Sequence, residues 1–266
     1  MSLSEDIKRN VWFYLLSQGY TWKQFFASYR AQAVSWTIVQ GISTLAPLIS
    51  LSVIYSVSSG LPGWTYFQLL VLASLAQITG GILWYMIGPR QLVSSMRGGG
   101  LDQMLLKPYN PILVIFARFG GASSIGTVMS GALLLAYALA NAHAEIYALL
   151  AFIPLYIAGV SVFVMAVLTI TLASYILIED ASYISWVLNI VQSASQYPVS
   201  IYGLLGATLL SVLVPISFAT YFPAAVLFGK MSYAYVLPAA LAAALAAVAL
   251  YFASSRLLKR YKSGGG

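Results

Sequence analysis

Long apolar runs alternate with short polar segments along the whole chain of 266 residues. A helix needs about 20 mostly apolar residues to cross a membrane. Runs of this kind cover residues 33–55, 64–87, 112–140, 146–178, 201–218 and 233–253. The pattern predicts an all-α integral membrane protein with a bundle of six transmembrane helices. Pro215 and Pro223 interrupt the end of the fifth run, so a short re-entrant segment is expected there.

The segments outside these runs are too short to hold a separate soluble core. We therefore expect a cytoplasmic N-terminal segment over residues 1–32, a transmembrane domain over residues 33–254 and a basic cytoplasmic tail over residues 255–266. Aromatic and basic residues recur at helical spacing over residues 20–32, which predicts a helix lying in the inner membrane interface. A cytoplasmic extension of the first span is the alternative.

Composition agrees with lipid as the solvent, because 61% of the residues are hydrophobic and 7% are charged. If the N-terminus is cytoplasmic, the basic residues collect on the inner side and Lys230 alone lies outside. This distribution predicts that both termini are cytoplasmic. The net charge of +7 then reflects membrane orientation, and no binding of nucleic acid is expected. The residues expected at the inner interface are Trp22, Lys23, Phe26, Arg30 and Arg118.

Charge is sparse inside the apolar runs. Arg118 lies within the third run, where it either reaches the inner headgroups or marks a substrate path. Glu145 precedes the fourth run, and Glu179 and Asp180 close it, so no carboxylate lies in the middle of a span. Carriers coupled to protons or sodium usually bury such a carboxylate. The sequence therefore argues against secondary active transport.

Catalytic and metal-binding patterns are missing from the sequence. The chain has no cysteine and one histidine, His143, which is expected in an outer loop, so no metal site is predicted. The segment Gly229-Lys230-Met231-Ser232 lacks the upstream glycine and the Ser/Thr directly after Lys that a Walker A motif requires. We expect no enzymatic activity, and any ATP that drives this protein is hydrolysed by another chain.

Small residues mark faces that pack helices together. Ala122, Gly126 and Ser130 recur every four residues in the third run, and the sixth run is rich in alanine. Such faces allow close approach of two helices. They indicate a bundle or an oligomer.

The inner loop between the second and third runs is the most informative polar segment. After three glycines, residues 101–107 are expected to form a short helix, with Asp102 at its start and Lys107 at its end. Met104, Leu105 and Leu106 give this helix an apolar surface that suits a groove on a partner. An ordinary amphipathic loop helix is the alternative.

At this loop the sequence resembles the permease subunits of type-2 ABC exporters, and in particular the branch called uncharacterised ABC-type permease components. The resemblance rests on three motifs in the family's order. They are Gly-Gly-x-Leu-Asp-x-x-Leu-Leu-Lys-Pro-x-Asn-Pro at residues 98–111, Gln-Tyr-Pro-Val-Ser-Ile-Tyr at residues 196–202, and Val-Pro-Ile-Ser-Phe-Ala-Thr-Tyr-Phe-Pro-Ala-Ala at residues 214–225.

The resemblance implies two permease subunits, identical or related, that flank a central path above two cytosolic ATPase subunits. ATP and Mg would bind to the ATPases, and this chain would hold no cofactor. The residues then expected to couple to the ATPase are Arg97, Leu101, Asp102, Met104, Leu105, Leu106 and Lys107. Those expected in the translocation path or outer gate are Tyr197, Tyr202, Pro215, Phe218, Tyr221, Phe222 and Pro223. The interfacial helix would be a connecting elbow.

We therefore expect a multi-pass subunit of an ATP-driven exporter in the cell membrane. A path with few fixed charges, lined by Tyr, Phe, Ser and Thr, favours an amphipathic or apolar substrate. The alternative is a channel-forming or scaffold subunit without active transport. An intramembrane enzyme is a distant third, because catalytic motifs are missing.

Overall fold

The computed structural model describes residues 3–28, 30–57, 60–142, 146–178, 181 and 183–261, which form helices and turns with no strand among them. The α-helices are α1 (Leu3–Ser28), α2 (Arg30–Ser43), α3 (Leu45–Val57), α4 (Tyr66–Met86), α5 (Pro89–Arg97), α6 (Asp102–Leu105), α7 (Pro111–Phe119), α8 (Ile125–Asn141), α9 (Ile146–Ile178), α10 (Ile184–Ala194), α11 (Gly203–Thr208), α12 (Tyr221–Leu227) and α13 (Val236–Leu258). Short helical turns lie between them: η1 (Ala122–Ser124), η2 (Val199–Tyr202), η3 (Leu209–Leu213), η4 (Ile216–Phe218) and η5 (Tyr233–Tyr235).

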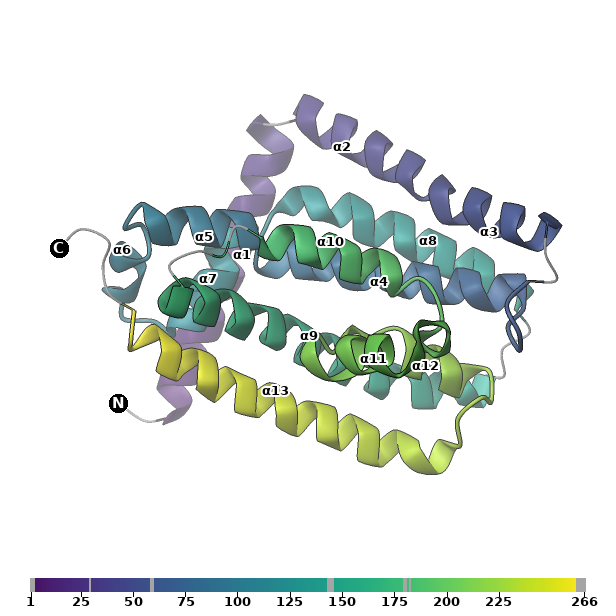
Figure 1. The fold of residues 1–266 in the computed structure, drawn as a ribbon. Helices are drawn as coiled ribbons and strands as arrows, with labels where there is room; N and C mark the ends of the chain where they lie inside the picture. The colour runs from purple at the N-terminus through teal and green to yellow at the C-terminus, as the bar shows by residue number, and fades with distance from the viewer. Residues whose placement is uncertain are drawn as a thin grey trace.

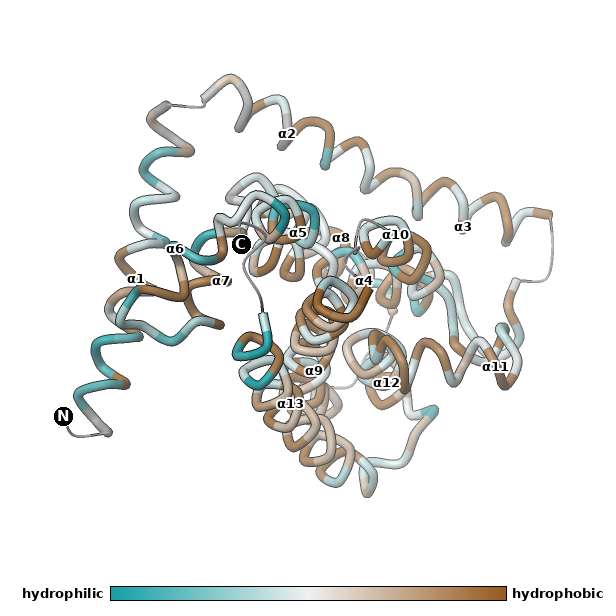
Figure 2. Tube along the Cα trace, turned by 60° about the vertical axis from the view of Figure 1, so that its left-hand side comes forward, coloured by the Kyte–Doolittle hydropathy of each residue, from teal (hydrophilic) through white to brown (hydrophobic). Residues whose placement is uncertain are grey.

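The long helices run roughly side by side, and α1 crosses one end of the bundle (Figure 1). Helix α4 packs along α8, and α9 packs along α13. Helix α12 contacts both α9 and α4, so it joins the two pairs. Most of α4 is buried, whereas α3 and α13 bury only a few of their residues. Figure 2 shows that these exposed helices are largely hydrophobic, as expected for a surface solvated by lipid.

Several helical units are long and apolar enough to cross a membrane. In the described residues these are Ile38–Val57, Tyr66–Arg97, Ala148–Ile178 and Tyr233–Leu258. A fifth is counted if Ile184–Ala194 and Val199–Leu213, which are bent by 115° to each other, form one span. Helix α8 is apolar but shorter, with 17 residues. The chain is thus an all-helical, multi-pass membrane protein, while the count of six spans and their orientation stay predictions.

Small residues bring α4 and α8 together. A Cβ atom at Gly81 would lie 2.7 Å from the Val128 side chain, and one at Gly131 would lie 2.9 Å from the Ile78 side chain. Both distances are too short for non-bonded carbon atoms, so only glycine permits this spacing. Gly126 and Ser130 of the predicted small-residue face are also buried on α8. The side chain of Ala122 lies outside the described residues.

The third apolar run is broken, which corrects the prediction of one span over residues 112–140. Helix α7 ends at Phe119, and α8 begins only at Ile125. Gly120 lies against the end of α4, where an added Cβ atom would come within 1.8 Å of the Tyr85 carbonyl oxygen. Arg118 therefore lies, exposed, in the last turn of a separate short helix.

The fifth run also differs from the prediction, which started it at Ile201. Helix α10 begins at Ile184 and packs on α4 and α5. The chain then bends before Pro198, because proline disfavours helical backbone at the residue that precedes it. The bend thus lies between two apolar helical segments, Ile184–Ala194 and Val199–Leu213.

The N-terminal helix α1 is longer than the predicted interfacial helix over residues 20–32. It ends at Ser28, and residues 30–32 already belong to α2. Helix α1 packs on α7 and η1 across the end of the bundle. Its hydrophilic positions are visible in Figure 2, where α1 and α5 carry much of the polar surface.

Candidate functional site

One end of the bundle carries nearly all of the positive charge. This basic end consists of α1, α5, α6, α7 and the last turn of α13 (Figure 1). Its lysines and arginines are Lys8, Arg9, Lys23, Arg90, Arg97, Lys107, Arg118, Arg256, Lys259 and Arg260. Among the described basic side chains, Lys230 alone lies at the opposite end.

The glycine-rich loop at the basic end leads into a helix that is shorter than predicted. The chain turns at Gly99, whose φ of +68° lies in the left-handed region that glycine adopts easily. Helix α6 covers only Asp102–Leu105, and turn geometry follows up to Lys107. The segment is nevertheless ordered as a single turn of helix between α5 and α7.

The apolar side chains of this loop do not all face outward, which corrects the predicted partner surface. Leu101 and Met104 are buried in the core of the basic end, so they anchor the loop. Leu105 is half-buried, and Leu106 is 85% exposed. Gln103 and Lys107 are exposed as well. The surface offered to a partner is therefore built from these exposed side chains and not from Met104.

Tyr261, which follows α13, contacts the same region of the basic end. Its hydroxyl donates a hydrogen bond to the Met96 carbonyl oxygen at 3.2 Å. Burial, together with the negative charge of the neighbouring Asp102, raises the pKa of Tyr261 to about 12. The sequence reasoning missed this residue because it treated residues 255–266 only as a basic tail.

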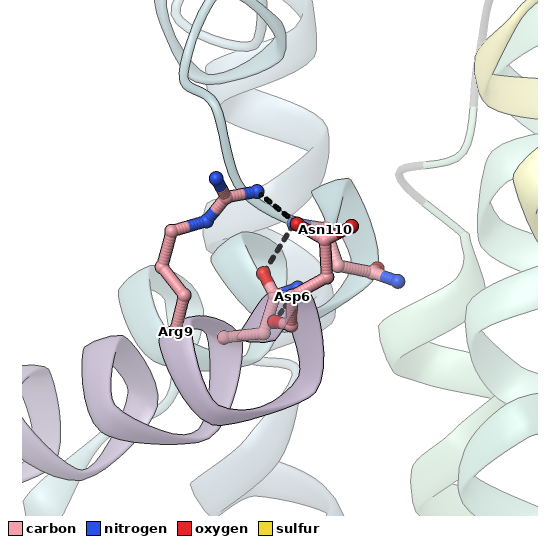
Figure 3. A network of polar contacts seen from close by, with 4 residues as sticks. Asp6, Arg9 and Asn110 are labelled. Carbon is pink, nitrogen blue, oxygen red and sulfur yellow. Dashed lines mark hydrogen bonds and ion pairs between the residues drawn. The ribbon is translucent and has the colours of Figure 1, made fainter. Parts of the chain in front are cut away.

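Asn110, which ends the loop, joins three helices. Its side-chain oxygen accepts a hydrogen bond from the Ile112 backbone N–H at 3.0 Å and so caps α7. Its own backbone N–H donates to Asn10 of α1 at 2.9 Å, and its side-chain N–H donates to the Tyr251 hydroxyl of α13. Figure 3 shows Asn110 beside the Asp6–Arg9 ion pair of α1. The same contact includes a stacked ring pair, Phe13 and Tyr109, with centroids 4.1 Å apart.

The predicted inner-interface residues lie mostly on α1. The indole N–H of Trp22 donates to the Tyr85 hydroxyl at 3.2 Å, which ties α1 to α4. Lys23 is exposed. The side chains of Phe26 and Arg30 lie outside the described part of the chain, as do His143, Glu145, Glu179 and Asp180. Among the described residues, no group of acidic or histidine side chains is arranged to hold a metal ion.

The predicted gate residues form a packed cap at the opposite end. Pro215 and Pro223 are buried, and Phe218 and Phe222 have ring centroids 5.0 Å apart. The rings of Tyr221 and Trp64 lie 6.0 Å apart. Farther along, the Tyr202 hydroxyl donates to the Ala194 carbonyl oxygen at 2.8 Å, and Tyr197 packs at the edge of the hydrophobic cluster that contains Trp64. None of the predicted gate residues lines either of the two clefts described below, and their gating role stays a prediction.

Lys230 lies on the surface of the same end of the bundle. Its ammonium group lies 4.6 Å from the centroid of the Trp64 ring and donates a hydrogen bond to the Gly63 carbonyl oxygen. Burial lowers the pKa of Lys230. This contact joins the turn before α4 to the turn before η5.

A polar cleft that the sequence reasoning missed lies between α2–α3, α4, α8 and α10. Its volume is about 480 Å³, and we call it the amide cleft. A second cleft of about 320 Å³ shares Gln40 and Thr127 with it and continues toward Trp84 and the end of α4. The side chains that line the amide cleft with amide groups are Gln40, Gln77, Asn189, Gln192 and Gln196. Amides carry no charge, so the scarcity of charge in the apolar runs gives no sign of this cleft. The closeness of Asn189 and Gln192 on α10 is the sequence signal that could have indicated it.

Comparison with known proteins supplies the family. Residues 42–265 match the model of the family described as ABC-2 family transporter protein. Nothing matches this chain among curated proteins or solved structures. The match covers the loop at residues 98–111, the packed cap and the lining of the amide cleft except Gln40, whereas α1 precedes it. With its several membrane-crossing helices, the chain therefore belongs to the ABC-2 transporter family as a permease subunit.

Proposed function

We propose that this chain is the membrane subunit of an ATP-driven exporter, which moves its substrate outward while a separate ATPase subunit hydrolyses ATP with Mg. The observation that carries the proposal is the loop at residues 98–107. It is anchored by Leu101 and Met104, exposes Leu106 and Lys107, and lies at the basic end of the bundle. The positive-inside rule assigns such an end to the cytoplasm, where ATP is available.

The anchoring of α6 supports a mechanical role for this loop. Because Leu101 and Met104 are part of the core of the basic end, a displacement of α6 moves α5 and α7 with it. Asn110 extends this connection to α1 and α13 through its hydrogen bonds. Closure of an ATPase dimer below the loop would thus reach the long helices without unfolding any of them.

The exposed helices support assembly with a second permease, either an identical copy or a related chain. Helices α3 and α13 expose most of their apolar side chains, and α13 exposes small alanines that allow close helix approach. Lipid covers whatever part of this surface a second subunit leaves free. We infer that the exporter holds two permeases and two ATPases.

The test begins with co-expression of this chain and an ATPase from the same genome, followed by purification through a tag on the permease. The proposal predicts that the ATPase co-purifies and that its ATP turnover depends on the permease. Export is then measured in inside-out vesicles, where ATP added outside should drive substrate into the lumen. Absence of a co-purifying ATPase contradicts the proposal.

The amide cleft favours one alternative, a channel that needs no ATP, because uncharged polar side chains can solvate a water-filled path. Ion conductance of the purified chain in liposomes, without nucleotide, would identify such a channel. Active transport predicts no conductance above that of empty liposomes.

A further inference from the structure

The chemistry of the amide cleft points to a class of substrate. Both adjoining clefts are lined by side chains with amide and hydroxyl groups, and no charged side chain lines either of them in the described part of the chain. The lining comes from four different parts of the bundle, α2–α3, α4, α8 and α10. The cleft therefore gathers uncharged polar side chains from parts of the chain that are distant in sequence.

One amide of the cleft is fixed by the protein. The Gln77 side-chain N–H group donates to the Thr44 hydroxyl at 2.9 Å and to the Ser130 hydroxyl at 2.8 Å. These bonds connect α4 to the α2–α3 junction and to α8. Gln77 therefore holds three walls of the cleft in place and leaves its carbonyl oxygen as an acceptor.

Other amides have hydrogen-bonding groups to spare. The side chains of Asn189, Gln192 and Gln196 make no hydrogen bond with any described residue. Gln192 is nevertheless positioned, because it fits against Gly80 of α4, where an added Cβ atom would lie 1.5 Å from the Gln192 side-chain nitrogen. These amides thus present donors and acceptors to the cleft.

We propose that the amide cleft binds a neutral, hydroxyl-rich group of the sugar or polyol class, and this inference rests on the proposed function as a transporter. Each amide offers both a donor and an acceptor, and a hydroxyl group is also both. An ionic group would find no countercharge here, and an apolar group would leave the amides without partners, which is unfavourable. Trp84 in the adjoining cleft adds an apolar face against which a sugar ring packs.

The inference changes the substrate expected from the sequence. An amphipathic molecule remains compatible with the cleft only if its polar part is neutral and carries several hydroxyls, and a wholly apolar molecule is not expected to bind. The group is then either a free sugar or the headgroup of a lipid, and the two sources share the same recognition chemistry.

The experiment uses the permease in nanodiscs that contain three lipids with identical acyl chains. They are diacylglycerol, monoglucosyl diacylglycerol and phosphatidylglycerol, and the lipid retained after purification is measured by mass spectrometry. We expect the glucosyl lipid to be retained about tenfold above the other two, because tenfold corresponds to about 1.4 kcal/mol, which a few hydrogen bonds of this kind supply together. If free maltose displaces the glucosyl lipid, the natural ligand is a free sugar. If the glucosyl lipid is preferred and maltose does not displace it, the natural ligand is a lipid headgroup.

Matched variants connect the preference to the cleft. Asn189→Leu and Gln196→Leu remove amides that make no hydrogen bond with described residues, so each should fold normally and lower the preference by roughly threefold to tenfold. Asn141→Leu, which removes an exposed amide at the outer end of α8, should leave it unchanged. Equal retention of the three lipids, stronger retention of phosphatidylglycerol, or an unchanged preference in both cleft variants overturns the proposal.

A separate measurement distinguishes failure of the proposed function as a pump from failure of the proposed ligand of the cleft. ATP turnover of the complex with its ATPase is measured with the same probes. If the glucosyl lipid binds selectively but no probe changes ATP turnover, the assignment as a pump fails while the cleft assignment stands. If ATP turnover requires the permease but binding is not selective, the pump stands and the cleft assignment fails.

Discussion

The backbone N–H of Asn110 donates a hydrogen bond to the side-chain oxygen of Asn10 at 2.9 Å, although the two residues are 100 positions apart in the sequence. This bond joins the helix that crosses the basic end to the loop proposed to meet the ATPase. The remaining polar groups of Asn110 bind α7 and α13. The residue is therefore a junction of three helices whose individual bonds can be tested separately.

Asn110→Ala should lower the free energy of unfolding by about 1–2 kcal/mol, because it removes a helix cap together with the bond to Tyr251. The matched variant Asn10→Ala removes the bond between Asn110 and α1, together with the bond that the Asn10 side chain donates to the Asp6 carbonyl oxygen within α1, and should cost about 1 kcal/mol. Denaturant titration in detergent micelles measures both values. A larger loss in Asn10→Ala than in Asn110→Ala would contradict the assignment of Asn110 as the junction.

Two leucine-sized side chains in the loop should behave differently. Met104→Ala should lower the free energy of unfolding by about 2–4 kcal/mol, because it leaves a cavity in the core of the basic end. Leu106→Ala should change stability by less than about 0.5 kcal/mol, because Leu106 is exposed. The proposed function predicts that Leu106→Ala still reduces the ATP turnover of the complex. Normal turnover in Leu106→Ala would rule out this side chain as a contact with the ATPase.

Tyr261 should make stability depend on pH at the alkaline end. Burial and the charge of Asp102 raise the pKa of Tyr261 to about 12, against about 10 in an unfolded chain. A raised pKa means that the neutral phenol is favoured in the folded protein, so its contribution is complete below pH 10 and lost as the pH rises toward 12. Titration of tyrosinate absorbance should detect this group.

The controls for this titration are single substitutions. Tyr261→Phe should remove the high titration step, and Asp102→Asn should move the pKa of Tyr261 back toward its ordinary value. If the step persists unchanged in Asp102→Asn, the carboxylate has no part in the shift.

Gly159 permits close contact between α9 and the packed cap. An added Cβ atom at Gly159 would lie 2.0 Å from the Phe218 carbonyl oxygen, so Gly159→Ala should destabilise the protein by about 1–3 kcal/mol. Gly41→Ala, on an exposed face of α2 with no atom within 4 Å, should instead stabilise it by about 0.5–1 kcal/mol. Thermal unfolding of the two variants, followed by circular dichroism, should give shifts of opposite sign.

The sequence predicted the helical membrane class, the family and the loop at residues 98–111, because hydropathy and short motifs are local properties. It did not predict the break at Gly120, because a glycine pair in an apolar run also fits a packing face. The reason for glycine at the break is a tertiary contact, because the Tyr85 carbonyl oxygen lies too close to Gly120 to leave room for a side chain. Burial of Leu101 and Met104 likewise depends on core residues distant in sequence.

The amide cleft was missed for a related reason. Asn189 and Gln192 lower the hydropathy of residues 184–194, so the fifth run was expected to begin only at Ile201. In the folded chain Asn189 is exposed, Gln192 is half-buried, and both line the cleft. Polarity that lowers the hydropathy of the sequence here belongs to a cleft between helices.

The fit of Gln192 against Gly80 gives a means of adjusting the cleft. With no side chain at position 80, the Gln192 amide of α10 lies directly against α4. Alanine at position 80 would meet only the end of the flexible Gln192 side chain, so the amide would turn aside while the two helices keep their spacing. Such a substitution would move one amide of the cleft without removing any hydrogen-bonding group, and so would vary the placement of that amide while the chemistry of the cleft stays constant.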